Sequence, residues 1–125
     1  KAIGLISTQY LKDPPDPRWK DGKGILAFKA FMRKYDPAAD LSDAGNVYGY
    51  SVAATMVQVL KQCGSDLTRA NVMKQAAALH DLELPLLLPR IKVNTSPTHF
   101  YPIDQEQLVK FDGKTWLPFG AVVSG

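Results

Sequence analysis

The stretch that decides the fold is residues 46–64, NVYGYSVAATMVQVLKQCG. Apolar side chains fill so many of its positions that barely one polar stripe remains at helical spacing, which is typical of a helix covered on most sides. Lys61 favours the negative end of the helix dipole, and Gly64 can adopt the left-handed conformation that caps a helix C-terminus. We therefore expect a buried central helix around which the other elements pack.

The start of this helix is the first candidate ligand contact. Ser42 and Asp43 are possible N-caps, and the small Gly45 and the amide-bearing Asn46 precede the aromatic Tyr48. Because the first turn of a helix carries unpaired N–H groups and partial positive charge, a small anion or a polar ligand head can bind there. The alternative is an ordinary capped core helix.

Length and composition bound the class of protein. The chain has 125 residues, of which 46% are hydrophobic and 22% charged, and this fits one soluble globular domain. The formal net charge of +3 comes from scattered Lys and Arg residues, so nucleic acid is not an expected partner. No apolar run approaches the roughly 20 residues that span a bilayer. The single cysteine, Cys63, is expected to be a small packed hydrophobe.

Residues 3–10, IGLISTQY, predict a buried strand that becomes polar at its C-terminal end. Open α/β sheets place ligands beside the C-terminal ends of strands, so this end is a second candidate contact; the alternative is a solvated strand end. The strand begins at the first residues, without an initiator Met or a signal peptide. We therefore expect a processed or truncated chain whose missing part supplies the strand's neighbours.

Two further helices are predicted. Residues 24–35 carry apolar side chains three or four positions apart, which indicates an amphipathic helix. Thr68 is the expected N-cap of a third helix whose apolar side reaches Leu79. No repeated βα unit closes a parallel sheet, so these helices need a sheet supplied from outside.

The C-terminal residues predict strands. A short strand is expected over 91–94, and residues 107–117 carry a hairpin signal with Asp112-Gly113 as a two-residue turn. Residues 119–123 predict a further short strand, bent at Pro118.

Motifs that carry enzyme chemistry are missing from the sequence. It has no Gly-rich phosphate loop, no nucleophile elbow, and no HExxH or CxxC metal spacing. Asp104 and Glu106 are expected to lie on a solvated edge and not to act as an acid–base pair. We therefore expect no enzymatic activity, no metal site and no cofactor.

Small-molecule binding fits the sequence better. Aromatic and amide side chains gather at the strand end and at the central helix start, namely Gln9, Tyr10, Asn46, Tyr48 and Tyr50. Small-molecule sites combine apolar walls with a few placed polar groups. The alternative is that these tyrosines are core residues with satisfied hydroxyl groups.

Several segments resemble the C-terminal third of periplasmic solute-binding proteins of ABC transporters. They are residues 4–14, GLISTQYLKDP; 46–53, NVYGYSVA; 60–64, LKQCG; and 111–116, FDGKTW. Within that family the chain is similar to the branched-chain amino-acid (Leu/Ile/Val) receptor group. The resemblance runs over nearly all of the chain in the same order.

The resemblance implies an α/β chain that is part of a bilobed type I periplasmic-binding-protein fold, in which doubly wound sheets with flanking helices form two lobes that close on a ligand. Residues 1–12 would form a crossing strand between the lobes. Residues 13–90 would form the helical part of the first lobe, and residues 91–125 the return crossing and the C-terminal hairpin of the second. A missing N-terminal part would hold most ligand contacts, including the acid that pairs with an amino acid's ammonium group.

Carried over by position, the resemblance implies cleft-facing residues at Gly45, Asn46 and Val47, with Tyr48 adjacent. Gln9 and Tyr10 complete the expected ligand-binding set. Where amino-acid-binding members have a bulky aromatic residue, this chain has Gly45-Asn46, which leaves space for a larger or aromatic acid.

The function that the resemblance implies is capture of an amino acid or a related small carboxylate for an ABC permease. The protein would work in the periplasm of a Gram-negative bacterium, and its precursor would carry a signal peptide. Two alternatives remain open: a ligand-sensing regulatory receptor of the same fold, and a small α/β hydrolase built on an unrelated domain.

Overall fold

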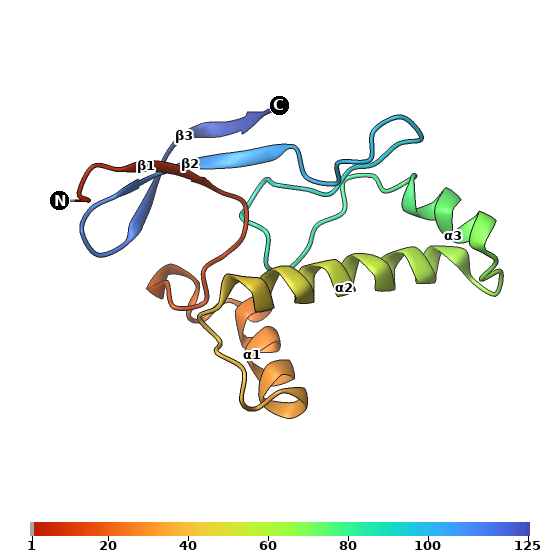
Figure 1. Ribbon diagram of the computed structural model, residues 1–125, viewed down its shortest axis with the longest axis horizontal. Coiled ribbons are helices and arrows are strands. Elements are labelled where there is room, and N and C mark those ends of the chain that lie inside the picture. Colours follow the sequence, from red (N-terminus) through yellow and green to blue (C-terminus); the bar gives the residue numbers. More distant parts are fainter. Residues whose placement is uncertain (1) are drawn as a thin grey trace.

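The computed structural model describes residues 2–125, which form a small sheet beside a set of helices. The elements are β1 (Ile6–Gln9), the short 3-10 helix η1 (Pro17–Trp19), α1 (Lys23–Tyr35), α2 (Ala44–Cys63), α3 (Arg69–Ala76), β2 (Gln105–Phe111) and β3 (Trp116–Ser124). Figure 1 shows α2 as the long central helix. In this view α1 lies near the start of α2 and α3 near its end, and the sheet lies above the N-terminal end of α2. Within the described range, no helix is long and apolar enough to cross a membrane.

The central helix and its caps are confirmed. Of the two candidate N-caps Asp43 is the one used, because its carboxylate accepts a 2.7 Å hydrogen bond from the Gly45 N–H. The helix ends at Cys63, which is 6% exposed as expected for a packed thiol, and Gly64 follows with a φ of 60°. A positive φ suits glycine, which has no Cβ to clash with the backbone.

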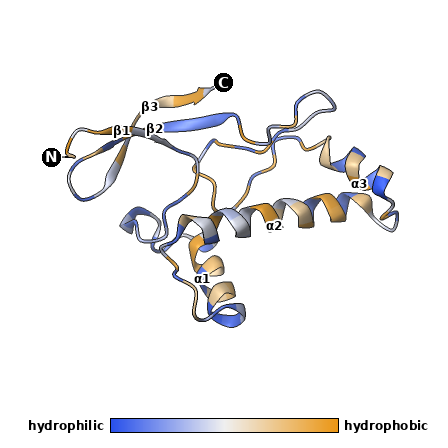
Figure 2. Cartoon of the chain, viewed as in Figure 1, coloured by the Kyte–Doolittle hydropathy of each residue, from blue (hydrophilic) through white to orange (hydrophobic). Residues whose placement is uncertain are grey.

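The expectation that other elements cover this helix on most sides is wrong for the described residues. Only one side of α2 is buried, through Val47, Ser51, Val59 and Cys63. Large apolar side chains on its other sides are 42–55% exposed, namely Tyr48, Val52, Met56, Val57 and Leu60. Figure 2 shows apolar colouring along most of α2. The apolar pattern predicted the helix correctly, but residues 2–125 leave about half of each of these side chains uncovered.

The buried side of α2 joins two hydrophobic clusters. Near its start Val47 packs with α1, whose predicted helix is confirmed, and with the loop before β2; the members are Ile25, Phe28, Met32, Val47 and Leu86. Near its end Val59 and Cys63 pack with the irregular segment 79–93, and the members are Val59, Cys63, Leu79, Leu87, Leu88, Ile91 and Val93. The third helix begins after Thr68, whose hydroxyl accepts from the Asn71 N–H at 3.4 Å, as predicted. It ends at Ala76, so the expectation that its apolar side reaches Leu79 is wrong; Leu79 packs in the cluster from the segment after the helix.

All strand pairs in the described sheet are antiparallel, in the order β1-β2-β3. Among themselves, the strands of residues 2–125 form no parallel pair. β1 pairs with β2 from Ile6 opposite Lys110 to Gln9 opposite Gln107. The expected burial of the first strand is wrong here, because Ile3, Leu5 and Ile6 are 73%, 55% and 57% exposed. Strand burial depends on neighbouring elements, and the described residues supply none on this face.

The C-terminal hairpin is confirmed, but its turn is offset by one residue from the prediction. The Asp112 N–H donates to the Thr115 carbonyl at 3.1 Å, so Gly113-Lys114 form the tip of the turn. The Asp112 carboxylate accepts the N–H groups of Lys114 and Thr115, both at 2.8 Å. These hydrogen bonds, that from Thr115 first, hold the pKa of Asp112 below its ordinary value. An acceptor just before the tip therefore decides which residues turn.

Two smaller strand predictions are wrong. Residues 91–94 form no strand, and Val93 makes a single bridge with Leu82 instead. Residues 119–123 belong to one continuous β3 that includes Pro118. The register of β2 against β3 shifts between Gln107 and Val109, so a bulge takes up the irregularity.

One arginine, Arg18, connects the helix η1 to the hairpin by a hydrogen bond. The Arg18 guanidinium donates to the carboxylate of Asp16, which is 7% exposed, and also to the Trp116 carbonyl at 2.8 Å. The hydrogen bonds from Arg18 hold the pKa of Asp16 below its ordinary value, and burial acts in the opposite direction.

The close contact of α1 with the loop before β2 gives a first prediction. A Cβ on Gly24 would lie 2.5 Å from the Pro85 carbonyl oxygen and 2.8 Å from the Pro85 Cβ. We expect Gly24→Ala to destabilise the protein by about 1–3 kcal/mol, because backbone must move to make room. Urea unfolding measures this. Arg33→Ala on the exposed side of α1 is the control and should change stability by less than about 0.5 kcal/mol. Equal stabilities of the two variants would contradict the contact.

The Asp16–Arg18 pair gives a second prediction, on pH. Because the pKa of Asp16 is lowered in the folded state, its ion pair adds stability above the ordinary carboxyl range and loses it as pH falls through the lowered value. We expect Asp16→Asn to cost about 1–2 kcal/mol at pH 7 and clearly less at pH 3. Urea unfolding at both pH values tests this, with the exposed Asp21→Asn as control. A cost for Asp16→Asn that does not change with pH would contradict it.

Candidate functional site

A cavity of about 640 Å³ lies where the end of β1, the first turn of α2 and the hairpin meet. We call it the α2-start cavity. Five residues predicted to bind ligand line it: Gln9, Tyr10, Gly45, Val47 and Tyr48. The two candidate regions of the sequence, at a strand end and at a helix start, are therefore brought together in space.

The position of the β1 end is fixed by the loop before β2. The Tyr10 carbonyl accepts the Leu88 N–H at 2.8 Å, and the Lys12 N–H donates to the Leu86 carbonyl at 2.8 Å. Leu86 is 0% exposed, so these bonds tie the chain after β1 to the core. Tyr10 is thereby held against the cavity.

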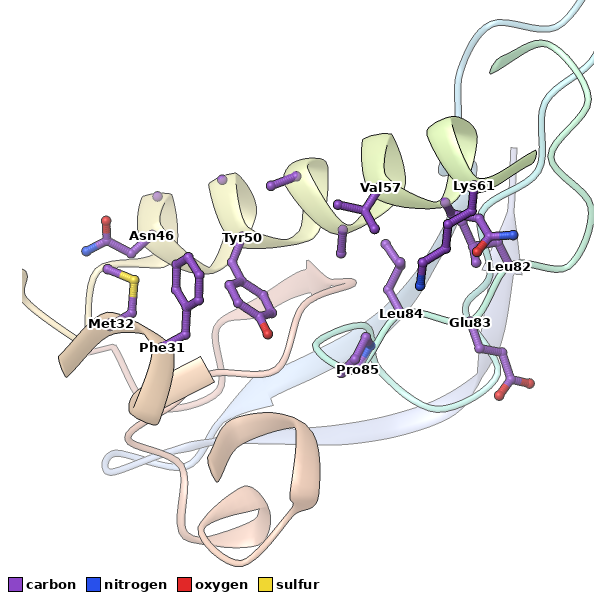
Figure 3. A pocket seen from close by; sticks show the side chains of 15 residues that line it. Phe31, Met32, Asn46, Tyr50, Val57, Lys61, Leu82, Glu83, Leu84 and Pro85 are labelled. Carbon is purple, nitrogen blue, oxygen red and sulfur yellow. The ribbon is translucent and has the colours of Figure 1, made fainter. Parts of the chain in front are cut away.

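Asn46 is the predicted site residue that the structure places elsewhere. Its amide donates to the Asp40 carbonyl at 2.8 Å, which supports the turn before α2. It lines a second groove, also of about 640 Å³, between α1, α2 and the segment 82–85 (Figure 3). Tyr50 lines this groove too, and its ring packs edge-on against Phe28 and Phe31 at centroid distances of 5.4 and 5.3 Å. Tyr50 therefore packs, partly buried, against the hydrophobic cluster of α1, which favours the packing role that was the alternative for this residue.

The start of α2 is already occupied by an acid of the chain itself. The Asp43 carboxylate takes the Gly45 N–H, and the Asp43 carbonyl takes the Asn46 N–H at 3.1 Å. A carboxylate at this position also satisfies the positive end of the helix dipole. This geometry argues against the small anion that was expected there. Val47 is 1% exposed, so its side chain packs in the hydrophobic core and only borders the cavity.

The cavity contains acidic residues that the sequence analysis did not assign to it. Glu106 of β2 lines it and is half-buried, although a solvated edge was expected, and Asp13 lines it from the segment after β1. The pairing of β1 with β2 joins segments from near the two ends of the sequence, such as Ile6 and Lys110. A local sequence pattern cannot predict the register of such a pair. The sequence put Glu106 in an extended region just before the predicted hairpin, but it did not assign the side chain to a face.

The charges around the cavity favour a cation. Burial raises the pKa of Tyr10, and the neighbouring Tyr48 and Glu106 raise it further. Lys12 is the one cationic side chain among the lining residues, but its ammonium donates to the Pro85 carbonyl at 2.7 Å and lies 5.5 Å from the centroid of the Trp19 ring. The Lys12 ammonium is thus engaged by Pro85 and Trp19.

The groups in the cavity are suited to holding a small molecule by hydrogen bonds, charge and ring contacts. The lining residues include Thr8, Tyr10, Ser42 and Tyr48, which carry hydroxyl groups, Asp13 and Glu106, which carry carboxylates, and Trp116, which carries an indole. Between residues 2 and 125, no three His, Cys, Asp or Glu side chains lie close enough together to hold a metal ion.

Comparison with known proteins gives matches in structure. No family model matches the chain, and no curated protein sequence matches it. The fold is similar to a crystal structure described as a branched chain amino acid ABC transporter from Thermus thermophilus with bound valine. That match has a TM-score of 0.76 and 15% identity, and it covers 99% of this chain and 34% of the other.

A second match is a crystal structure of a possible leucine/isoleucine/valine-binding protein from Rhodopirellula baltica, with a TM-score of 0.67 and 18% identity over 95% of this chain and 30% of the other. The chain thus spans about a third of the length of each. The resemblance drawn from residues 4–14, 46–53, 60–64 and 111–116 is confirmed at the level of the fold. The chain has the fold of part of a type I periplasmic-binding protein.

Proposed function

We propose that these residues belong to the extracytoplasmic substrate-binding component of an ABC importer. It captures an amino acid or a related small carboxylate, aromatic acids included, in a cleft between two lobes. The observation that carries this proposal is the structural match over 99% of the chain, at a TM-score of 0.76, to a transporter protein crystallised with valine. The partners are then an ABC permease and the rest of a longer protein, and the location is the periplasm, reached by a signal peptide in the precursor.

In this proposal the α2-start cavity is one wall of the cleft. Gln9, Tyr10, Gly45, Val47 and Tyr48 line it, and Asn46 holds the preceding turn in place. The ligand binds between this wall and a second wall, and the closed form is favoured because only closure gives contacts to both. The permease then recognises the closed form.

The arrangement of elements supports a division near residue 12, whereas Ile91 and Val93 pack in the cluster of Val59 and Cys63 and so give the division at residue 90 no such support. β1 lies in one sheet with β2 and β3, whereas α1, α2 and α3 and the segment after them form the two hydrophobic clusters. In the proposed division, residues 1–12 form the crossing strand and residues 13–90 the helical part of the first lobe. Residues 91–125 form the return crossing and the C-terminal hairpin of the second lobe. The chain passes from one body to the other along β1 and returns along β2.

The uncovered side of α2 supports a longer protein. We call it the apolar face of α2, made of Gly49, Val52, Ala53, Met56, Val57 and Leu60, which are all exposed. No charged residue lies between Ala44 and Leu60, and the glycine and alanine allow another element to approach closely. An uncharged face of this kind is typical of a helix that packs on a sheet.

The energy of covering this face is substantial. Fully burying one Val, Leu or Met side chain is worth about 1.5–3 kcal/mol, and Val52, Met56, Val57 and Leu60 are 42–50% exposed. Covering these four side chains would therefore add roughly 3–6 kcal/mol. We propose that a sheet from the upstream part of the protein covers them, because this chain spans 34% and 30% of the two similar structures.

Ligand binding gives a third prediction. In the full-length protein, Tyr48→Ala should weaken binding of the best amino acid among valine, leucine and phenylalanine about tenfold or more, because the ring borders the cavity. Isothermal titration calorimetry measures the affinity. Tyr101→Ala is the control, since Tyr101 is 76% exposed and lies outside the cavity. If the wild-type protein bound no amino acid and no aromatic or aliphatic acid, the proposed function would be wrong.

The apolar face of α2 gives a fourth prediction. In the full-length protein, Ala53→Glu should cost about 2 kcal/mol or more, because it would bury a carboxylate against an apolar sheet. Gln62→Glu puts the same side chain on an exposed position of the same helix and should change stability by less than about 0.5 kcal/mol. Thermal unfolding compares the two. Equal effects would show that nothing covers the face, and a cost that depends on protein concentration would show that a second copy does.

A further inference from the structure

A smaller cavity, of about 300 Å³, lies between the sheet, η1 and the turn at residues 88–90. We call it the Arg90 cavity. The described residues that line it include two arginines, Arg18 and Arg90, two glutamines, Gln9 and Gln107, and the ring of Trp19, but no Asp or Glu. The α2-start cavity, by contrast, has two acids among its lining residues. The two cavities therefore differ in the sign of their charge.

The pairing of β1 with β2 sets the two glutamines side by side in the Arg90 cavity. Gln9 lies opposite Gln107 in the register, and residues paired across strands project from the same face of a sheet. The Gln107 amide nitrogen donates to the Phe119 carbonyl at 2.7 Å, which fixes this side chain. Because side chains alternate along a strand, Glu106 projects from the other face. The sheet thus separates the Arg90 cavity from that carboxylate.

Arg90 supplies the unpaired positive charge of this cavity. The guanidinium of Arg18 is neutralised by the buried carboxylate of Asp16, and it also donates to the Trp116 carbonyl at 2.8 Å. Among residues 2–125, the guanidinium of Arg90 makes no hydrogen bond, and none of the five ion pairs includes it. Arg90 is exposed, so an anion can reach it from solvent. Its planar fork of N–H donors matches the oxygens of a carboxylate or a phosphate.

The backbone at Arg90 is strained. Its φ is 74°, in the left-handed region that disfavours residues with a Cβ. The Ile91 N–H donates to the Leu88 carbonyl at 3.2 Å and both side chains are buried, so the turn is fixed on either side of Arg90. A glycine would adopt this conformation without strain. Strained residues cluster at ligand-binding sites, where the role of the side chain outweighs the conformational cost.

We propose that the Arg90 cavity binds a small oxyanion, either phosphate or the carboxylate of a small organic acid, with Arg90 as the main charged contact. The Nη1 group of Arg18 is a further donor, because the hydrogen bonds of that guanidinium within the described residues use only Nε and Nη2. The Gln9 amide is another. The site lies outside the proposed ligand cleft, although Gln9 borders both cavities, so its anion is a second ligand.

The test uses the full-length protein with inorganic phosphate and with acetate as probes, at an ionic strength held constant with sodium chloride. Isothermal titration calorimetry on the wild type should show saturable binding of at least one probe, and the tighter one tells which oxyanion the site prefers. Arg90→Gln should weaken that binding about 10- to 100-fold, because it removes a charged hydrogen-bond donor. Arg90→Lys keeps the charge and should retain part of the affinity.

Arg69→Gln is the matched control, because Arg69 is an exposed arginine outside this cavity and should not alter binding. Tyr48→Ala alters the proposed cleft and should leave the binding of the anion unchanged. Arg90→Gly separates binding from folding. It relieves the backbone strain, so it should raise the thermal unfolding midpoint measured without anion, and it should still lose the binding.

Binding of neither anion by the wild type would overturn the inference, and so would binding that Arg90→Gln leaves unchanged. If the wild type bound neither anion and both Arg90→Gln and Arg90→Gly lowered stability, an acid elsewhere in the full-length protein would be the partner of Arg90. The proposed function stands in all these cases, because amino-acid binding in the cleft is measured separately.

Discussion

The antiparallel pairing of β1 with β2 is the constraint on which the site depends. It sets Gln9 opposite Gln107, and so places the chain after β1 beside the strand that carries Glu106. The hydrogen bonds of the Tyr10 carbonyl and the Lys12 N–H to Leu88 and Leu86 then tie the same segment to the core under α2. One pairing of distant segments therefore assembles a cavity from a strand end, a helix start and a hairpin. A slip of one residue would turn Glu106 away from the cavity and bring Gln107 into it.

The chain has two kinds of uncovered surface, which differ in chemistry. The α2-start cavity has hydroxyl groups and unpaired carboxylates among apolar walls, and this mixture is typical of small-molecule sites. The apolar face of α2 has no charge at all, and such a surface is typical of an interface between elements of one protein. Both lie on the same helix, with the cavity at its start and the face along its length. If a sheet covers this face, as proposed, it would hold the start of α2 in place beside the cavity.

Local patterns predicted the helices, and long-range pairing decided the site. The spacing of Ile25, Phe28 and Met32 and the caps Asp43 and Thr68 are local features, and the structure confirms the three helices they indicated. The turn after Phe111 was predicted one residue too early because the Asp112 side chain accepts the N–H groups that define it. The burial of β1 and the face of Glu106 depend on elements distant in sequence, so composition and periodicity could not give them. Asn46 was correctly predicted at the start of the central helix. Its amide, however, donates a hydrogen bond to the Asp40 carbonyl and does not line the α2-start cavity.

The charges at the start of α2 bear on what the cavity beside it can accept. A helix start usually attracts an anion, yet here Asp43 fills that role within the chain. With the first turn satisfied, the unpaired charges of the cavity are the carboxylates of Asp13 and Glu106, near the partly buried Tyr10. A wall that closes on this cavity would therefore be favoured where it carries positive charge or hydrogen-bond donors, because only the closed form would bring those groups to the two carboxylates.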